Sequence, residues 1–337
     1  MQQKLTIWVL TERGLTGTEN QCLGVAEALS AEIPCDIITK RLRLRWPQCL
    51  WSPYLPFGEH LGMVSADSDP LTTPFPDILI AAGRKAVGPA RAIRQASQGR
   101  SFICILQHPR VNLNDFDLVA MPVHDWKNGT FSALTAPSTP DRLFLTHGAP
   151  NRITPTLLAA AREKWKRELS ALPAPRLAVL IGGNSKTHRL GTGQMEDIIA
   201  RLRKRQKTTG GGLMITVSRR TPKDLVEKLK DAFKDRNTAL IYTGTGENPY
   251  HGFLAWADYI LSTNDSTSML SDAATTGQPI DMIPLPGGSK RHDRFMAHLT
   301  SCGIGVDDRA YPPFHDAQDV ALKILELLEQ RKKKDLP

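Results

Sequence analysis

Residues 176–184 read RLAVLIGGN, a short apolar run that ends abruptly in two glycines and an asparagine. Such a run, bounded by turn residues, is typical of a strand that is buried on both faces of a parallel sheet. Strands of the same kind follow it, separated by helix-like stretches: GLMITVS (212–218), TALIYTG (238–244), DYILST (258–263) and PIDMIPL (279–285). Strands that alternate with helices predict right-handed βαβ units and a parallel sheet.

The residues before this run show the same alternation on their own. The predicted strands are LTIWVL (5–10), CDIIT (35–39), DILIAA (77–82), FICIL (102–106) and DLVAM (117–121). The pattern restarts after the proline-containing segment SALPAP (170–175). We therefore predict an α/β protein of two Rossmann-like domains whose parallel sheets face an interdomain cleft. A chain of 337 residues suits two domains.

The expected boundaries follow from that segment. Residues 1–170 form the first domain and 171–315 the second. Residues 316–337 form an amphipathic helix with a basic tail, for which a solvated end is the simplest interpretation.

Composition narrows the class of protein. The chain is 41% hydrophobic and 23% charged, as expected for a soluble globular protein, and it has no apolar run long enough to span a bilayer. Its five cysteines are scattered and never in CxxC spacing, which argues against disulfides or a structural zinc site and for the cytoplasm. The net charge of +9 favours an anionic partner without choosing among nucleotide, nucleic acid and lipid surface.

Polar or glycine-rich clusters follow the predicted strands of the second half. Ligands of open α/β sheets bind beyond the carboxyl ends of the strands, and helix N-termini there are suited to phosphates. Ordinary turns and helix caps are the alternative explanation of each cluster. The expected donor-site residues are Gly182, Gly183, Asn184, Ser185, Lys186, Ser218, Arg219, Arg220, Glu247, Asn248, Asn264, Ser266, Thr267, Ser268 and Asp272.

The first half has its own strand-end set. His108 and Glu19 are the candidates for proton transfer, with Asp125 a weaker third, although a lone histidine is more often structural. The other residues expected near an acceptor are Gly17, Asn20, Gln21, Arg84 and Arg110. No metal motif of the DxD type stands in a suitable context, so we expect neither a metal nor a cofactor.

The segment RLRLRWPQCLWSPYLPF (41–57) mixes arginines with aromatic side chains. This combination suits the headgroup level of an anionic membrane, a packing element between domains, or nucleic acid. We expect an anionic membrane surface or a lipid acceptor as a partner rather than nucleic acid, and hence a cytoplasmic protein that can lie on the inner face of the cell membrane.

Several segments together closely resemble the elongated-mitochondria family, the mitochondrial-fission proteins of plants with many bacterial members. They are GTENQCLGVAEAL (17–29), AAGRKAVGPARAI (81–93), LQHPRVNLNDFDLVAMPVHD (106–125), IGGNSKTHRL (181–190), ITVSRRTP (215–222) and WADYILSTNDSTSMLSDAATTGQPI (256–280). The absence of a presequence before the first strand favours a bacterial member.

Residues 262–304 are also similar in layout to the donor half of GT-B glycosyltransferases, especially the lipid-linked peptidoglycan type. That resemblance implies that the strand end at 264–268 meets a nucleotide diphosphate and that Asp272 holds the ribose. The chain departs from the pattern with Asp where Glu is usual, and with Asn264-Asp265 where small residues are common. Because a carboxylate beside a diphosphate is repulsive, we assign Asp265 to capping the helix.

The resulting expectation is a metal-independent GT-B-type glycosyltransferase that uses a nucleotide-diphosphate sugar, with an acceptor that is lipid-linked. A nucleoside-diphosphate-sugar epimerase and a non-catalytic scaffold associated with membranes or division machinery are the alternatives.

Overall fold

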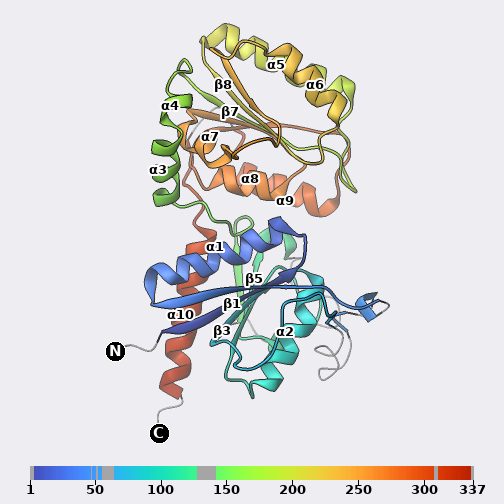
Figure 1. The fold of residues 1–337 in the computed structure, drawn as a ribbon, viewed down its shortest axis with the longest axis vertical. Coiled ribbons are helices and arrows are strands. Elements are labelled where there is room, and N and C mark those ends of the chain that lie inside the picture. Colours follow the sequence, from blue (N-terminus) through green and yellow to red (C-terminus); the bar gives the residue numbers. More distant parts are fainter. Residues whose placement is uncertain are drawn as a thin grey trace. The chain divides into compact units, whose positions relative to one another are not determined.

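The computed structural model describes residues 4–46, 48–50, 52–54, 64–126, 142–306 and 310–334. The chain forms two compact units (Figure 1). The first contains residues 1–152 together with 315–337, and the second contains 153–314. Trp51 and Phe57, from the segment rich in arginine and aromatics, lie outside the described residues.

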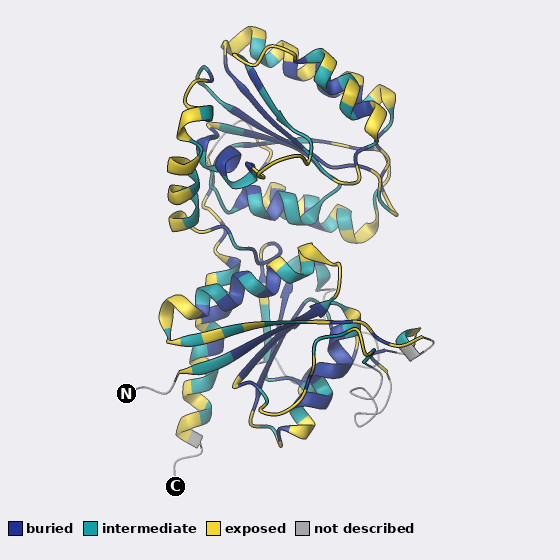
Figure 2. Cartoon of the chain, in the orientation of Figure 1, coloured by how far each residue is buried: buried dark blue, intermediate teal, exposed yellow. Residues whose placement is uncertain are grey.

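The sheet of the first unit has six parallel strands in the order β2-β1-β3-β4-β5-β6. Their bounds are β1 Leu5–Glu12, β2 Cys35–Leu42, β3 Ile78–Ala82, β4 Phe102–Leu106, β5 Leu118–Pro122 and β6 Leu143–Thr146. β3, β4 and β5 are buried along their whole length, as Figure 2 shows, because helices cover both faces of the sheet.

The covering helices of the first unit come from distant parts of the sequence. α1 (Thr16–Glu32) and α10 (Asp316–Lys334) pack on one face, where Val25 and Ile324 are fully buried. α2 (Arg84–Ala96) packs on the other face through Ala86, Ala90 and Ile93. Short 3₁₀ turns at η1 (Gln48–Leu50), η3 (Leu113–Asp115) and η4 (Val123–Asp125) complete the connections.

The sheet of the second unit has five parallel strands in the order β11-β10-β7-β8-β9. Their bounds are β7 Leu177–Ile181, β8 Leu213–Val217, β9 Ala239–Tyr242, β10 Tyr259–Thr263 and β11 Ile280–Ile283. β7 is central and fully buried. The apolar part of RLAVLIGGN (176–184) therefore forms the central strand of this sheet.

Helices cover both faces of this second sheet as well (Figure 1). On one face lie α5 (Thr192–Thr209) and α6 (Lys223–Ala232). On the other lie α7 (Tyr250–Trp256), α8 (Thr267–Ala274) and α9 (Lys290–Ser301), with α3 (Pro155–Lys164) and α4 (Lys166–Leu169) beside α7. In the parts of the chain that the structure describes, no helix is both long and apolar enough to cross a membrane.

The two units differ from the predicted domains at both junctions. The helices before SALPAP belong to the second unit, since Leu169 is fully buried in its core and Trp256 donates to the carbonyl of Arg162 at 2.9 Å. The final helix belongs to the first unit, where the Asp316 carboxylate accepts from the backbone N–H groups of His147 (2.7 Å) and Gly148 (2.8 Å). The prolines of SALPAP mark a turn inside the second unit rather than a linker.

Candidate functional site

Strand order brings together the loops that follow β8, β7 and β10. β7 lies between the other two strands, so residues 182–186, 218–221 and 264–268 meet at one edge of the sheet. The loops are hydrogen-bonded to one another: Gly182 N–H donates to Thr263 Oγ1 at 2.7 Å, and Thr221 Oγ1 donates to the Gly182 carbonyl at 2.5 Å. Of the four polar strand ends that we expected to line one crevice in the second half, these three are joined directly.

The glycine pair after β7 allows this close packing. A Cβ on Gly182 would lie 1.9 Å from Asp265 Oδ1, and one on Gly183 would lie 2.3 Å from the backbone of Arg220. We expected both glycines to be among the residues that contact the donor. In the structure the neighbouring loops fill that space, so the glycines position the loops.

Asp265 is the buried centre of the three loops. Its side chain is fully buried, and Oδ2 accepts from Arg220 Nη2 at 2.8 Å and from Gly183 N–H at 3.2 Å. Thr263 Oγ1 donates to Oδ1 at 2.7 Å. The carboxylate thus compensates the charge of Arg220. This compensation weakens the electrostatic attraction between Arg220 and an anionic ligand.

The capping role that we assigned to Asp265 is wrong. Ser266 is the N-cap of α8, because its Oγ accepts from Met269 N–H at 3.3 Å. The Asp265 side chain is turned instead toward Gly183 and Arg220, where it satisfies three donors that a cap would leave unpaired.

The start of α8 keeps donors available. Among the described residues, no acceptor contacts the backbone N–H of Thr267 or Ser268, the first two residues after the cap. Lys186 and Arg219, at the ends of β7 and β8, are exposed, and no described carboxylate pairs with either. Two amides at a helix N-terminus and two uncompensated cations form an arrangement that can bind an anion.

Asp272 lies further along α8 and is joined to the loop after β9. Tyr250 Oη donates to Asp272 Oδ2 at 2.9 Å, and Asn248 Oδ1 accepts from Tyr250 N–H at 3.1 Å. Burial raises the pKa of Asp272 to about 7, although the hydrogen bond from Tyr250 acts in the opposite direction. The structure therefore brings Asn248 and Asp272 into one group through Tyr250, and sequence reasoning did not predict the hydrogen bond from Tyr250 to Asp272.

Several other predicted donor residues have their polar groups engaged within the protein. Asn184 Oδ1 accepts from Leu190 N–H, and Asn264 Oδ1 accepts from Leu285 N–H, both at 2.9 Å. Ser185 Oγ accepts from the backbone N–H groups of Thr187 and His188, and Ser218 Oγ from that of Arg220. Glu247 is exposed and pairs with Lys164 of α3. These side chains shape the loops, and Glu247 is tied to α3.

Two histidines beside these loops also escaped the sequence analysis. His188 is buried, and its ring contacts that of His292 edge to face with centroids 4.5 Å apart. Within the described residues the Nε2 atom of each ring is buried and has no hydrogen-bond partner. Burial, and then His188, lower the pKa of His292. No motif signals this pair, since His188 lies in the loop after β7 and His292 in the first turn of α9, about a hundred residues later.

In the first unit, Glu19 is held by Arg41. Two hydrogen bonds of 2.7 Å join the guanidinium to both carboxylate oxygens. The hydrogen bond from Arg41 lowers the pKa of Glu19, against the effect of burial. A paired carboxylate of lowered basicity is poorly suited to act as a general base, so the geometry disfavours the predicted role of Glu19.

His108 lies in a conformationally strained loop after β4. Its neighbours Gln107 and Arg110 have φ angles of 77° and 64°, which residues with side chains rarely adopt. His108 Nδ1 accepts from Arg110 N–H at 2.9 Å, and burial lowers the pKa of His108. The neutral ring with Nδ1 as an acceptor carries its proton on Nε2.

The residues predicted to lie near the acceptor do not all lie together in this unit. Some lie on α1 and beside the loop of His108, and Arg84 contacts η1. Gln21 Oε1 accepts from Gln107 Nε2 at 2.9 Å, which joins α1 to the loop of His108 and Arg110. Gly17 and Asn20 are exposed in the first turns of α1. Arg84 instead donates to the carbonyls of Cys49 and Leu50 at 3.3 Å.

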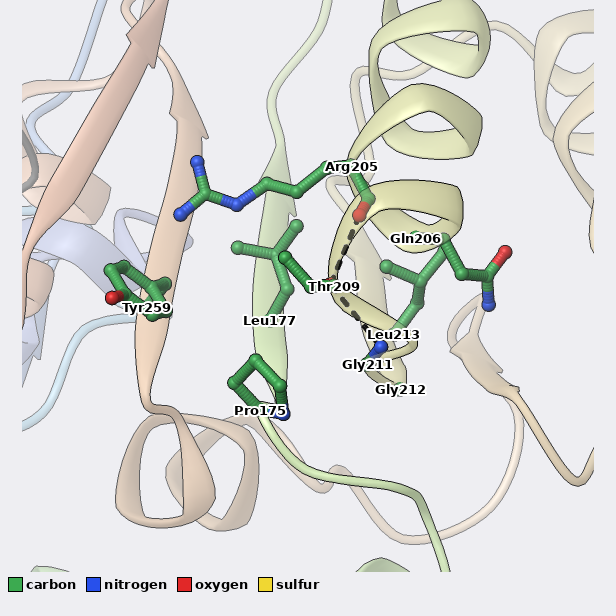
Figure 3. A pocket seen from close by; sticks show the side chains of 9 residues that line it. All are labelled: Pro175, Leu177, Arg205, Gln206, Thr209, Gly211, Gly212, Leu213 and Tyr259. Atoms are coloured by element: carbon green, nitrogen blue, oxygen red, sulfur yellow. Dashed lines mark hydrogen bonds between the residues drawn. The ribbon is translucent and has the colours of Figure 1, made fainter.

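A small surface pocket lies at the opposite edge of the second sheet (Figure 3). Pro175, Gly212 and Tyr259 line it at the amino ends of β7, β8 and β10, and the Arg205 guanidinium lies 4.6 Å from the centre of the Tyr259 ring. Because ligands of parallel sheets bind at the carboxyl ends, this pocket is separate from the candidate site.

Comparison with solved structures supports the fold. The chain is similar to the UDP-N-acetylglucosamine 2-epimerase of Methanocaldococcus jannaschii, with a TM-score of 0.55 and 12% identity over 96% of this chain and 99% of that one. Another structure of a UDP-N-acetylglucosamine 2-epimerase gives a TM-score of 0.54 at 12% identity, covering 99% and 98% of the two chains. The predicted GT-B-like pair of parallel α/β domains is confirmed.

Sequence comparison identifies relatives. The mitochondrial fission protein ELM1 of Arabidopsis thaliana is 31% identical over 280 residues, which cover 76% of this chain and 65% of the plant protein. The match therefore spans less than two thirds of that relative. An uncharacterized protein of Rickettsia prowazekii, RP120, is 26% identical over 94% of this chain and 97% of its own length.

The family model described as mitochondrial fission ELM1 matches residues 16–328, nearly the whole chain. The protein therefore belongs to the mitochondrial fission ELM1 family.

Proposed function

We propose that the second unit binds a nucleotide-diphosphate sugar and that the protein is a metal-independent glycosyltransferase of the GT-B type. One observation carries the proposal: the loops after β7, β8 and β10 converge on the start of α8, where two backbone N–H groups, Lys186 and Arg219 are available to an anion. The likeness to solved epimerase structures concerns the fold, and the choice of ligand rests on these groups.

The same groups suit the chemistry of glycosyl transfer. Negative charge builds on the leaving diphosphate as the glycosidic bond breaks, and donors fixed before the reaction stabilise that charge. The amides of Thr267 and Ser268 would contact the diphosphate, with Lys186 and Arg219 as counter-charges. The Asp272 carboxylate would accept hydrogen bonds from the ribose hydroxyls. The hydrogen bond from Tyr250 Oη would orient that carboxylate.

The acceptor would bind the first unit near His108, and we propose that it is lipid-linked. With Nδ1 engaged by Arg110 N–H, the Nε2 nitrogen of His108 carries the proton of the neutral ring. To act as a base toward an acceptor hydroxyl, the ring must change tautomer or release the bond from Arg110. Gln21 and Arg110 are the neighbours available to orient the acceptor.

A nucleoside-diphosphate-sugar epimerase is the second candidate, since it would use the same donor site without an acceptor. Product analysis separates the two activities. An epimerase converts a nucleotide sugar into its epimer without an acceptor, whereas a transferase releases nucleoside diphosphate only when an acceptor is supplied. A scaffold would bind no nucleotide.

The binding test is a thermal-shift screen of uridine, cytidine, guanosine and thymidine diphosphates, with a chelator present. A ligand at about 100 times its Kd raises the free energy of unfolding by about 2.7 kcal/mol. We expect one of these ligands to stabilise the protein and the double variant Lys186→Gln/Arg219→Gln to lose most of the effect.

The matched control is Lys204→Gln/Lys207→Gln, which removes the same charge from the exposed face of α5. This control should respond to the nucleotide like the parent. No shift with any of the four diphosphates, or an equal loss in both double variants, would refute the donor site.

A further inference from the structure

The segment after β2 presents three large apolar side chains to solvent. Trp46 is 79% exposed, Leu50 59% and Tyr54 55%, and these are the highest values among the large hydrophobic residues that the structure describes. All three lie within nine consecutive positions. We refer to Trp46, Leu50 and Tyr54 as the apolar tip.

A short helical turn lies between two of these side chains. Cys49 N–H donates to the Arg45 carbonyl at 3.0 Å, a helical i to i+4 bond, and η1 follows directly. Trp46 and Leu50 stand four positions apart at this short turn.

The tip is anchored to the body of the first unit. Ser52 and Pro53 are buried. Two arginines of α2 bind carbonyls of the segment: Arg84 contacts Cys49 and Leu50 at 3.3 Å, and Arg91 contacts Pro53 at 3.0 Å. A segment fixed in this way at its base holds its apolar side chains outward.

The charge around the tip is positive. Arg43 is compensated by Asp67 at 3.0 Å, and Arg91 by Asp115 at 2.9 Å. Arg45 and Arg84 are exposed, and neither pairs with a carboxylate among the described residues. Exposed aromatic side chains next to uncompensated arginines match the headgroup level of an anionic bilayer.

We propose that the apolar tip is a membrane-docking surface that inserts Trp46, Leu50 and Tyr54 among the headgroups of an anionic bilayer while Arg45 and Arg84 contact lipid phosphates. The first unit thereby holds the protein at a lipid surface, whether or not the second unit transfers a sugar.

The test is flotation of the full chain with vesicles of phosphatidylcholine alone or with one third phosphatidylglycerol. The parent should float with the anionic vesicles at low salt and bind them less at high salt, because exposed charges are screened. Trp46→Ser/Leu50→Ser/Tyr54→Ser should weaken binding by at least about tenfold, since three apolar groups no longer leave water. Arg45→Gln should remove part of the salt-sensitive binding.

The control is Ile38→Ser/Leu322→Ser, which alters two other exposed apolar residues of the first unit and should leave flotation unchanged. Trp46→Phe supplies a second readout, because it should still float but lose part of the fluorescence quenching by brominated lipid. A parent that does not bind anionic vesicles, a triple variant that binds like the parent, or unchanged quenching in Trp46→Phe would overturn the proposal. A tip that mediates self-association without vesicle binding would overturn it as well.

Discussion

Asp265 determines how much positive charge the loops after β7, β8 and β10 offer to a ligand. Its carboxylate is fully buried and accepts from Arg220, Gly183 and Thr263. Sequence reasoning correctly identified the repulsion between an aspartate and a diphosphate. It could not identify Arg220 as the partner, because the two residues lie 45 positions apart.

Asp265→Asn should destabilise the protein and free Arg220. Weakening this buried, charge-assisted hydrogen bond should cost about 1–3 kcal/mol of unfolding free energy, and the partial exposure of Arg220 favours the lower end. Denaturant unfolding of Asp265→Asn, Arg220→Gln and the double variant measures the coupling. Additive effects of the two single changes would show that the pair is not coupled.

Asp272 should make stability depend on pH in a defined direction. Its pKa is raised from 3.8 to about 7, so the folded state favours the protonated carboxyl while the unfolded state releases the proton. The resulting penalty is absent below pH 3.8, grows as the pH rises toward 7, and is constant above that value. Asp272→Asn should therefore be more stable than the parent at pH 8, with the difference shrinking toward pH 4.

Urea unfolding of both proteins across this range measures the effect. Tyr250→Phe removes the hydrogen bond that lowers the pKa of Asp272. It should therefore extend the pH range over which stability falls to higher pH. A difference between parent and Asp272→Asn that is the same at pH 4 and pH 8 would contradict a raised pKa.

The strands were easier to predict than the units to which they belong. Uniformly apolar runs such as 78–82 and 177–181 identify buried parallel strands from the sequence, and turn residues at strand ends identify the loops that meet at the site. Which unit α3, α4 and α10 join depends on contacts between residues far apart in the sequence. Leu169 packs in the core of the second unit, and Asp316 binds His147 of the first. A local sequence pattern does not predict such contacts. The same reason explains why the contact of Tyr250 with Asp272 and the pair of His188 and His292 were missed.

The helices α3 and α4 should be required for the second unit to fold. A fragment of residues 153–314 retains their packing on α7, whereas a fragment of 171–314 exposes the core around Phe253 and Trp256. We expect the longer fragment to melt cooperatively by circular dichroism and the shorter one to melt at a lower temperature or to aggregate. Equal melting of the two fragments would place the boundary near residue 170.

On the scale of the whole molecule, each unit carries a separate set of exposed groups. In the second unit these are Lys186 and Arg219 near the start of α8, and in the first they are Arg110 in the strained loop around His108 and the apolar tip. The two proposals therefore concern different units: nucleotide-sugar binding the second, and docking on a lipid surface the first. The description of the mitochondrial fission family names no ligand for the second unit, so nucleotide binding there requires a direct test.

Hydrogen exchange with and without nucleoside diphosphate tests that chemistry most directly, because it locates the ligand. We predict slower exchange at residues 182–186, 218–221 and 264–272, at the carboxyl ends of β7, β8 and β10, and unchanged exchange at residues 205–213 on the opposite edge. Protection confined to residues 205–213 or to the first unit, or no protection with any nucleoside diphosphate, would contradict the donor site.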